Sequence, residues 1–208
     1  EVRLGTLATA QSVLAEAPDA VMIATGAAFS REGRSNHLDQ PIAGHELRHV
    51  CTVDDVLLGR SRPTGKVVII DGDGSNAGVG VAEILGKRGC TVHFLAPRFS
   101  PVNPRVNNAE ETRFIVPRMK QAGVVFEPST WVSEIRDGEV TAYDIWTEEE
   151  REIMGVDAVV LATSRAASND LERELSGKVS QLFAIGDAAS PRMWAAATYE
   201  GHMFARAI

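Results

Sequence analysis

Three small residues in one short stretch have the spacing of a phosphate-binding loop. Gly72, Gly74 and Ala77 follow the apolar run Lys66 to Ile70 and precede a helix-like segment. In a dinucleotide site the first glycine forms a tight turn, the second lets the backbone approach a pyrophosphate, and the third position lets the helix contact the strand. The pattern G-x-G-x-x-A in this context therefore predicts a loop of the dinucleotide-binding type.

Acidic residues in the same loop oppose the binding of an anion. Asp71 and Asp73 lie where a pyrophosphate has to approach. Two like charges ~4 Å apart repel by ~4 kcal/mol near a protein surface, whereas a helix N-terminus returns only ~0.3–1 kcal/mol. The next strand ends at Leu95 without the acidic residue that binds the ribose of NAD, and Arg98, which could bind a 2′-phosphate, is expected to be solvated. We therefore expect a degenerate NAD(P) site.

Two other turns follow apolar runs and are candidates for cofactor binding. Thr25 and Gly26 form one of them, and Gly186 and Asp187 form the other. Ligands of open α/β sheets bind at the carboxyl ends of the strands, which is where both turns are expected. The Asp187 carboxylate could accept hydrogen bonds from sugar or ribityl hydroxyls. Pro191 is expected to begin the next helix, whose N-terminus can face an anion or an electron-rich ring.

A third motif suggests different chemistry. His45-Glu46-Leu47-Arg48-His49 matches H-E-x-x-H, the signature of zinc proteases. That chemistry needs both histidines on one face of a sustained helix. Pro41 and Gly44 precede the pair, and an apparent N-cap at Thr52 begins a new helix three residues after it. The residues therefore favour a loop, and a zinc hydrolase is the alternative from another class of function.

The elements that must position these residues follow a parallel α/β pattern, in which short β-branched runs alternate with helical segments. The stretch Thr130 to Met154 differs, because it alternates apolar and polar residues around Asp137-Gly138 and predicts a hairpin; Glu152 to Met154 would complete a three-stranded antiparallel meander. A capping-box spacing predicts a helix over Val53 to Leu58. The other strands are expected at Val2 to Gly5, Ala20 to Ala24, Lys66 to Ile70, Thr91 to Leu95, Val124 to Phe126, Val159 to Ala162 and Leu182 to Ile185.

Composition limits the possible partners. The 208 residues are 44% hydrophobic and 24% charged, as in ordinary globular proteins. The net charge of -7 argues against nucleic acid or anionic lipid as a partner. No apolar run approaches the ~18 residues of a membrane span, and the isolated Cys51 and Cys90 fit a reducing compartment. We therefore expect a cytoplasmic protein without a nucleic-acid or membrane partner.

The order of the turns resembles that of flavoproteins in which an FAD-type domain is interrupted by an NAD(P)-type domain. The resemblance implies an α/β fold of two interleaved Rossmann-like units with the antiparallel meander. Residues 1–60 are then part of the FAD- or ADP-binding domain, residues 61–165 the NAD(P)-binding domain, and residues 166–208 the return into the first. Because the sequence begins at Glu1 without a methionine, we expect a piece of a longer protein whose first unit is incomplete and binds ADP or FAD weakly.

The closing segment narrows the resemblance. IGDAASPRMWAAATYEGHMFARAI, the sequence YDIW at Tyr143 to Trp146 and the D-G-D-G loop look like the carboxyl-terminal half of the trimethylamine, dimethylamine and histamine dehydrogenase family. In that family an amino-terminal (β/α)8 barrel with FMN and a [4Fe–4S] cluster oxidises an amine, and electrons pass to an electron-transferring flavoprotein.

The resemblance implies ADP or FAD in the first domain, with Asp187 on the ribityl hydroxyls, a vestigial NAD(P) site, and no catalytic residue in this chain. A 2,4-dienoyl-CoA reductase-like enzyme, in which NADPH reduces a bound FAD, is the related alternative.

Overall fold

The computed structural model describes residues 1–103 and 109–208, and the chain divides into two compact units. A terminal unit combines Glu1–Ala28 with Ala166–Ile208, and a central unit comprises Phe29–Arg165. The division after residue 28 differs from the domain boundary expected at residue 60. The reason is that strand β3 (Val50–Thr52) pairs with the sheet of the central unit, so the segment before residue 60 packs there.

The terminal unit is built on two parallel strands, β1 and β12, whose register pairs Ala20 with Gln181 and Ile23 with Ala184. Its core is small and includes Ile23, Leu175 and Ala188. The carboxyl ends of both strands lie side by side, because the Ile185 N–H donates to the Ile23 carbonyl at 2.9 Å. The elements are α1 (Ala10–Ala15), β1 (Ala20–Ile23), α5 (Asp170–Leu175), β12 (Gln181–Ala184), the 3-10 turn η1 (Gly186–Ala188) and α6 (Trp194–Ala205).

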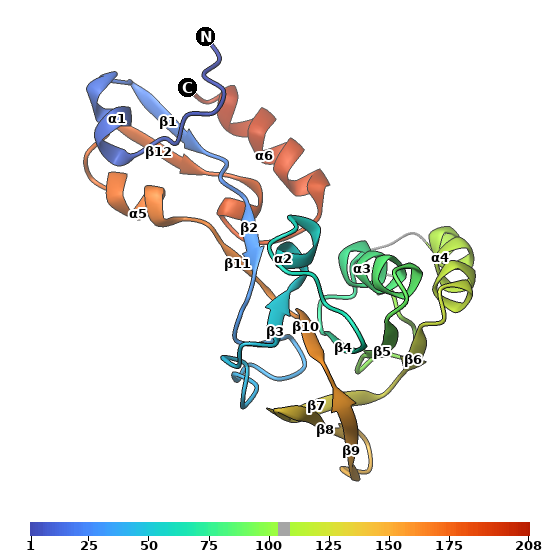
Figure 1. Ribbon diagram of the computed structural model, residues 1–208. Coiled ribbons are helices and arrows are strands. Elements are labelled where there is room, and N and C mark those ends of the chain that lie inside the picture. Colours follow the sequence, from blue (N-terminus) through green and yellow to red (C-terminus); the bar gives the residue numbers. More distant parts are fainter. Residues whose placement is uncertain (104–108) are drawn as a thin grey trace. The chain divides into compact units, whose positions relative to one another are not determined.

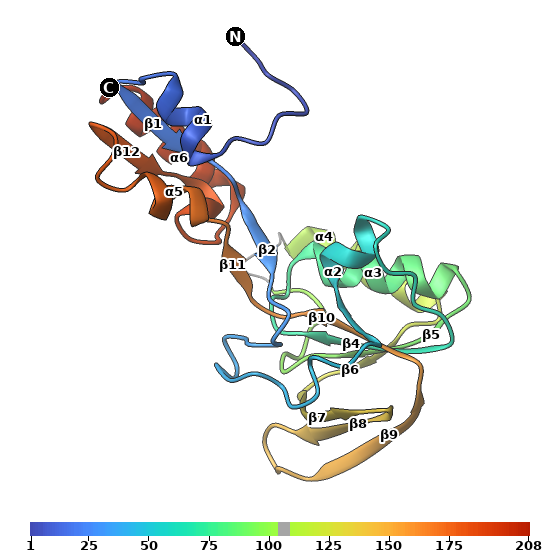
Figure 2. The same cartoon turned by 60° about the vertical axis from the view of Figure 1, so that its left-hand side comes forward.

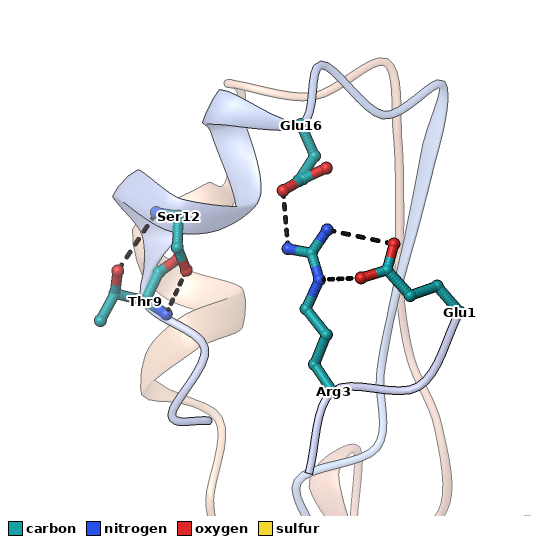
Figure 3. Close-up of polar contacts among 5 residues, drawn as sticks. All are labelled: Glu1, Arg3, Thr9, Ser12 and Glu16. Atoms are coloured by element: carbon teal, nitrogen blue, oxygen red, sulfur yellow. Dashed lines mark hydrogen bonds and ion pairs between the residues drawn. The ribbon is translucent and has the colours of Figure 1, made fainter. Parts of the chain in front are cut away.

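The strand expected at Val2 to Gly5 is wrong. Among the described residues no strand pairs with this segment, and Val2 and Leu4 are exposed. Gly5 has φ of +66°, which turns the chain away from an extended course. The segment is instead held by Arg3, which forms ion pairs with Glu1 and Glu16 (Figure 3).

Two helix starts in the terminal unit show how local polar groups set the boundaries. Helix α1 opens with a capping box, in which Thr9 and Ser12 exchange side-chain and backbone hydrogen bonds (Figure 3). Helix α6 starts at Trp194, so the expected start at Pro191 is wrong. The Arg192 N–H donates to the Asp187 carboxylate at 2.9 Å and holds this stretch in the preceding loop.

The central unit is built on a five-stranded parallel sheet in the order β3-β10-β4-β5-β6. Its inner strands are nearly continuous apolar runs because both faces of the sheet are covered. The elements of this unit are β3 (Val50–Thr52), α2 (Val53–Leu57), β4 (Lys66–Asp71), α3 (Asn76–Lys87), β5 (Thr91–Leu95), α4 (Ala109–Gln121), β6 (Val125–Glu127) and β10 (Ala158–Ala162). Two short strands, β2 (Ala27–Phe29) and β11 (Arg165–Ala167), contain the points at which the chain divides and form a separate two-stranded ladder.

The sheet of the central unit separates two hydrophobic layers. Helices α2, α3 and α4 cover one face, and the meander covers the other (Figures 1 and 2). The meander confirms the sequence prediction: β7 (Thr130–Arg136), β8 (Gly138–Asp144) and β9 (Glu150–Val156) are antiparallel neighbours. Gly138 has φ of +74° at the predicted hairpin. Within residues 1–103 and 109–208, no helix is both long and apolar enough to cross a bilayer.

Candidate functional site

The glycine-rich loop of the central unit has an acidic residue beneath it. Asp71 is the last residue of β4 and is fully buried. One carboxylate oxygen, Oδ1, accepts a hydrogen bond from the Gly74 N–H at 2.6 Å and another from Nη2 of Arg98 at 2.7 Å. The Arg98 guanidinium also donates to the Asp71 carbonyl at 3.3 Å. A loop N–H of the kind that binds a pyrophosphate in dinucleotide sites is therefore used by the protein's own carboxylate.

The two aspartates each have an arginine as counter-charge, which the sequence did not reveal. Asp73 Oδ1 lies 3.6 Å from Nε of Arg165. The expectation that Arg98 is solvated is wrong, because only 19% of its side chain is exposed. Repulsion between Asp71 and Asp73 is consequently not the main electrostatic feature of the loop. The main feature is a buried ion pair.

Burial sets the protonation of that pair. It raises the pKa of the Asp71 carboxyl from 3.8 to about 7, and the nearby Asp73 charge acts in the same direction. The Arg98 guanidinium and the Gly74 N–H lower the pKa but do not offset burial. Oδ2 of Asp71 has no hydrogen-bond partner within the part of the chain that the structure describes. The carboxyl group therefore changes its charge near neutral pH.

The predicted small residues of the loop face protein atoms. A Cβ added to Gly72 would lie 2.6 Å from Cβ of Ser35, and one added to Gly74 would lie 2.9 Å from Cζ of Arg98. Gly74 also has φ of +73°. Ala77 is the second residue of α3, and its N–H is bound by Oγ of Ser75 at 3.3 Å. The space directly above both glycines is thus filled by other parts of the central unit.

Close contact between helix and strand occurs at a residue that the motif did not select. A Cβ at Gly78 would lie 2.2 Å from Oδ2 of Asp71 and 3.2 Å from Cβ of Ala162. Gly78 therefore has the role that the third position of the motif assigns to Ala77. The signal in the sequence was available, since Gly78 directly follows Ala77, but a turn of non-standard length made the spacing ambiguous.

The two candidate turns of the terminal unit follow the adjacent carboxyl ends of β1 and β12. Thr25 Oγ1 donates to the Ser168 carbonyl, and the Gly26 carbonyl accepts from the Ser168 N–H at 2.9 Å. Gly26 has φ of +76°, and a Cβ there would meet no atom within 4 Å. Both turns thus start from adjacent strand ends, because Ile23 pairs with Ala184 and its carbonyl accepts from the Ile185 N–H.

Gly186 and Asp187 form a tight, well-anchored turn. Gly186 has φ of +58°, and a Cβ there would lie 2.8 Å from Cβ of Ala197 on α6. Its N–H donates to Glu200 at 2.8 Å. Asp187 is half-buried and accepts a hydrogen bond from the Arg192 N–H. The turn is therefore fixed by α6, and the open space at Gly26 leaves room for a ligand to approach the backbone after β1.

The histidines of the H-E-x-x-H motif do not share a helix. His45 and His49 lie in consecutive turns before β3. Nδ1 of His45 lies 3.1 Å from the Arg31 carbonyl, whereas Nδ1 of His49 lies 3.5 Å from Asp137. Within the described residues, no three His, Cys, Asp or Glu side chains are grouped as metal ligands. The geometry therefore offers no zinc-protease arrangement at this motif.

Comparison with known proteins places the fold in a family. Residues 5–201 match the model of the pyridine nucleotide-disulphide oxidoreductase family. The chain is similar to dimethylamine dehydrogenase of Hyphomicrobium sp. (strain x), with 30% identity over 96% of the chain and 31% of that protein. The chain thus spans about a third of that relative's length.

Two solved structures show the same similarity. Histamine dehydrogenase from Rhizobium sp. 4-9 matches with a TM-score of 0.89 and 30% identity, over 97% of this chain and 32% of the other. A 2-naphthoyl-CoA reductase matches with a TM-score of 0.80 and 27% identity, over 96% of this chain and 28% of the other. The matches to dimethylamine and histamine dehydrogenases confirm the resemblance to the amine dehydrogenase group that the sequence indicated.

Proposed function

Because the chain belongs to the pyridine nucleotide-disulphide oxidoreductase family, we propose that it is the nucleotide-binding part of an amine dehydrogenase-like oxidoreductase. The similarity to dimethylamine and histamine dehydrogenases over nearly the whole chain supports this. In this proposal the terminal and central units are two interleaved Rossmann-like units, FAD- or ADP-type and NAD(P)-type respectively. The oxidation of an amine takes place outside this chain, in a barrel with FMN and a [4Fe–4S] cluster, and electrons leave to an electron-transferring flavoprotein.

The terminal unit supplies the proposed nucleotide site. The single observation that carries the proposal is the pairing of β1 with β12, which brings two strand ends and their glycine turns together. Gly26 fits a nucleotide, since its α-carbon faces open space and its positive φ is accessible to glycine. Thr25 and Gly26 would then line the phosphates, and Asp187 would accept hydrogen bonds from sugar or ribityl hydroxyls. When bound, FAD would supply redox chemistry, whereas ADP would serve as a structural ligand.

The central unit is proposed to have lost NAD(P)H binding. The Asp71 carboxylate already accepts the hydrogen bond of the Gly74 N–H, and the Arg98 side chain lies against Gly74. A pyrophosphate entering this loop would have to displace both groups and leave a buried charge unpaired. The loss of that internal pair costs about 3–5 kcal/mol, more than the ~0.3–1 kcal/mol a helix terminus offers at an exposed site.

Calorimetric titration of the protein with FAD, ADP and NADPH tests this proposal. We expect FAD and ADP to compete for one site and NADPH to give no saturable heat. Gly26→Val should weaken the binding of FAD and ADP at least tenfold, because the valine side chain fills the open space. Asp187→Ala should lower the affinity for FAD more than the affinity for ADP, because ADP lacks ribityl hydroxyls. The control Asp137→Asn removes an acidic residue of the hairpin turn and should leave both affinities unchanged. Affinity for NADPH that equals that for ADP would contradict the proposal.

The second candidate is transfer of electrons from NADPH to FAD, as in a 2,4-dienoyl-CoA reductase-like enzyme. The similarity to a 2-naphthoyl-CoA reductase over 96% of the chain favours keeping it. The loop geometry separates the two candidates, because NADPH use requires the Asp71–Arg98 pair to open. Bleaching of FAD absorbance by NADPH in anaerobic mixing would support this second candidate.

A further inference from the structure

Two exposed aromatic rings stand nearly parallel in the central unit. Phe99 lies in the loop after β5, and Trp146 lies in the turn between β8 and β9. Their ring centroids are 6.3 Å apart and their planes differ by 12°. Phe99 is 78% exposed and Trp146 is 68% exposed. Because so much of each side chain is exposed, each ring keeps a large area that a ligand could contact.

Polar contacts hold the Trp146 ring in place, and Phe99 follows an anchored residue. The Trp146 N–H donates to the Asp144 carboxylate at 2.8 Å, and the indole Nε1–H donates to Oγ of Ser129 at 3.3 Å. Phe99 directly follows Arg98, whose guanidinium is fixed by the buried ion pair described above. The indole is therefore preorganised, which lowers the entropy lost when a ligand binds.

The pair lies at the edge of the sheet where ligands of α/β folds collect. The loop after β5 is joined to the end of β6, because the Ala96 N–H donates to the Glu127 carbonyl at 3.1 Å and the Thr130 N–H donates to the Ala96 carbonyl at 3.0 Å. Ser129, which anchors the indole, belongs to the same connection. Phe99 and Ser129 thus follow the carboxyl ends of the neighbouring parallel strands β5 and β6, and Trp146, in the turn of the antiparallel meander, is joined to them by its hydrogen bond to Ser129.

The surroundings of the pair are acidic. Asp144, Glu148 and Glu149 lie within three residues of Trp146, and both glutamates are exposed. Backbone N–H groups of the turn lower the pKa of the Asp144 carboxyl, which keeps it ionised at neutral pH. The neighbouring Arg151 is already paired with a carboxylate of β6. The local charge therefore favours a cation over a phosphorylated ligand.

We propose that Phe99 and Trp146 bind a planar organic cation between their rings, with the acidic turn 144–149 as its counter-charge. A ring inserted between two others needs ~7 Å, twice a carbon–carbon contact of ~3.5 Å. The centroids of the two nearly parallel rings are 6.3 Å apart and both side chains are exposed, so rotations of the side chains can open the spacing between the ring planes to this value. Two aromatic faces attract a cation through their quadrupoles in addition to stacking. A pyridinium ring and the guanidinium of an arginine share this chemistry.

Nuclear magnetic resonance of the ¹⁵N-labelled chain tests the proposal. The indole Nε1–H of Trp146 reports on binding, and those of Trp131 and Trp194 are internal references. The probes are 1-methylnicotinamide, its neutral counterpart nicotinamide, and N-acetylarginine amide. We expect a saturable shift confined to Trp146, at least about fivefold tighter for the pyridinium than for nicotinamide, and weaker at high salt. The third probe distinguishes a heteroaromatic cation from an arginine side chain.

Variants distinguish binding by the Phe99–Trp146 pair from general binding to the protein surface. Phe99→Leu should weaken 1-methylnicotinamide at least about fivefold, since one aromatic face is lost. Glu148→Gln combined with Glu149→Gln should weaken the binding of 1-methylnicotinamide and leave the affinity for nicotinamide unchanged. Phe114→Leu, at another exposed aromatic residue of the central unit, is the matched control. Equal affinity for the cation and the neutral ring, or an unchanged affinity in Phe99→Leu, would overturn the proposal.

Discussion

The carboxylate of Asp71 and the guanidinium of Arg98 form an ion pair at 2.7 Å beneath the glycine-rich loop of the central unit. The same carboxylate oxygen accepts the Gly74 N–H. The loop therefore keeps the strand, glycines and helix of a dinucleotide site while its polar groups bind one another. The absence of a ribose-binding acid after β5 agrees with this arrangement, since Arg98 at that strand end serves the protein itself.

Stability should depend on pH through Asp71. Its pKa is about 7 in the folded protein and 3.8 as an ordinary aspartate, so the folded state holds a proton that the unfolded chain releases. The contribution of Asp71 to stability is therefore present below pH 4 and lost as the pH rises to 7. Relative to Asp71→Asn, the wild type should lose about 4 kcal/mol of unfolding free energy over this range. Urea denaturation at several pH values measures it. A difference that grows with pH would show that Arg98 outweighs burial.

Arg98→Gln should destabilise the protein in a pH-dependent way. At pH 8 Asp71 is ionised, and the substitution leaves a buried charge without its partner, which lowers the free energy of unfolding by about 3 kcal/mol. At pH 5 the carboxyl is protonated and the loss should be smaller. Arg136→Gln, which removes ion pairs on the exposed hairpin, is the control and should cost less than about 1 kcal/mol. Equal losses at both pH values would indicate packing rather than charge.

Two glycines of α3 give a matched pair of substitutions. Gly78→Ala places a methyl group 2.2 Å from Oδ2 of Asp71 and should lower the free energy of unfolding by about 1–3 kcal/mol. Gly80→Ala meets no atom of the described residues within 4 Å and should raise the free energy of unfolding by about 0.5–1 kcal/mol, because alanine is the better helix former. Thermal denaturation of both variants measures the difference. Equal effects would mean that the close contact at Gly78 relaxes without strain.

Much of the fold could be predicted from sequence, because its signals are local. Apolar runs located the inner strands, and Thr52 with Asp55 located the start of α2, where both capping-box hydrogen bonds are present. The hairpin at Asp137-Gly138 was equally clear. The strand at Val2 to Gly5 failed because β structure needs a neighbouring strand, which sequence pattern alone does not provide.

The candidate site was less predictable because it depends on long-range contacts. Asp71 and Arg98 are 27 residues apart, and nothing in their spacing shows that they meet. Likewise, the contact of Ser35 with Gly72 comes from a segment without periodicity. An aspartate at a strand end was correctly noticed, but its burial, and hence its partner, required the structure.

Hydrogen exchange with and without bound nucleotide tests the central claim most directly. The account predicts that FAD or ADP protects the backbone amides at the ends of β1 and β12, over residues 23–26 and 184–188, and leaves those of the glycine-rich loop, residues 71–78, unchanged. NADPH should protect neither region. Protection of residues 71–78 by NADPH, without change at the ends of β1 and β12, would contradict the account.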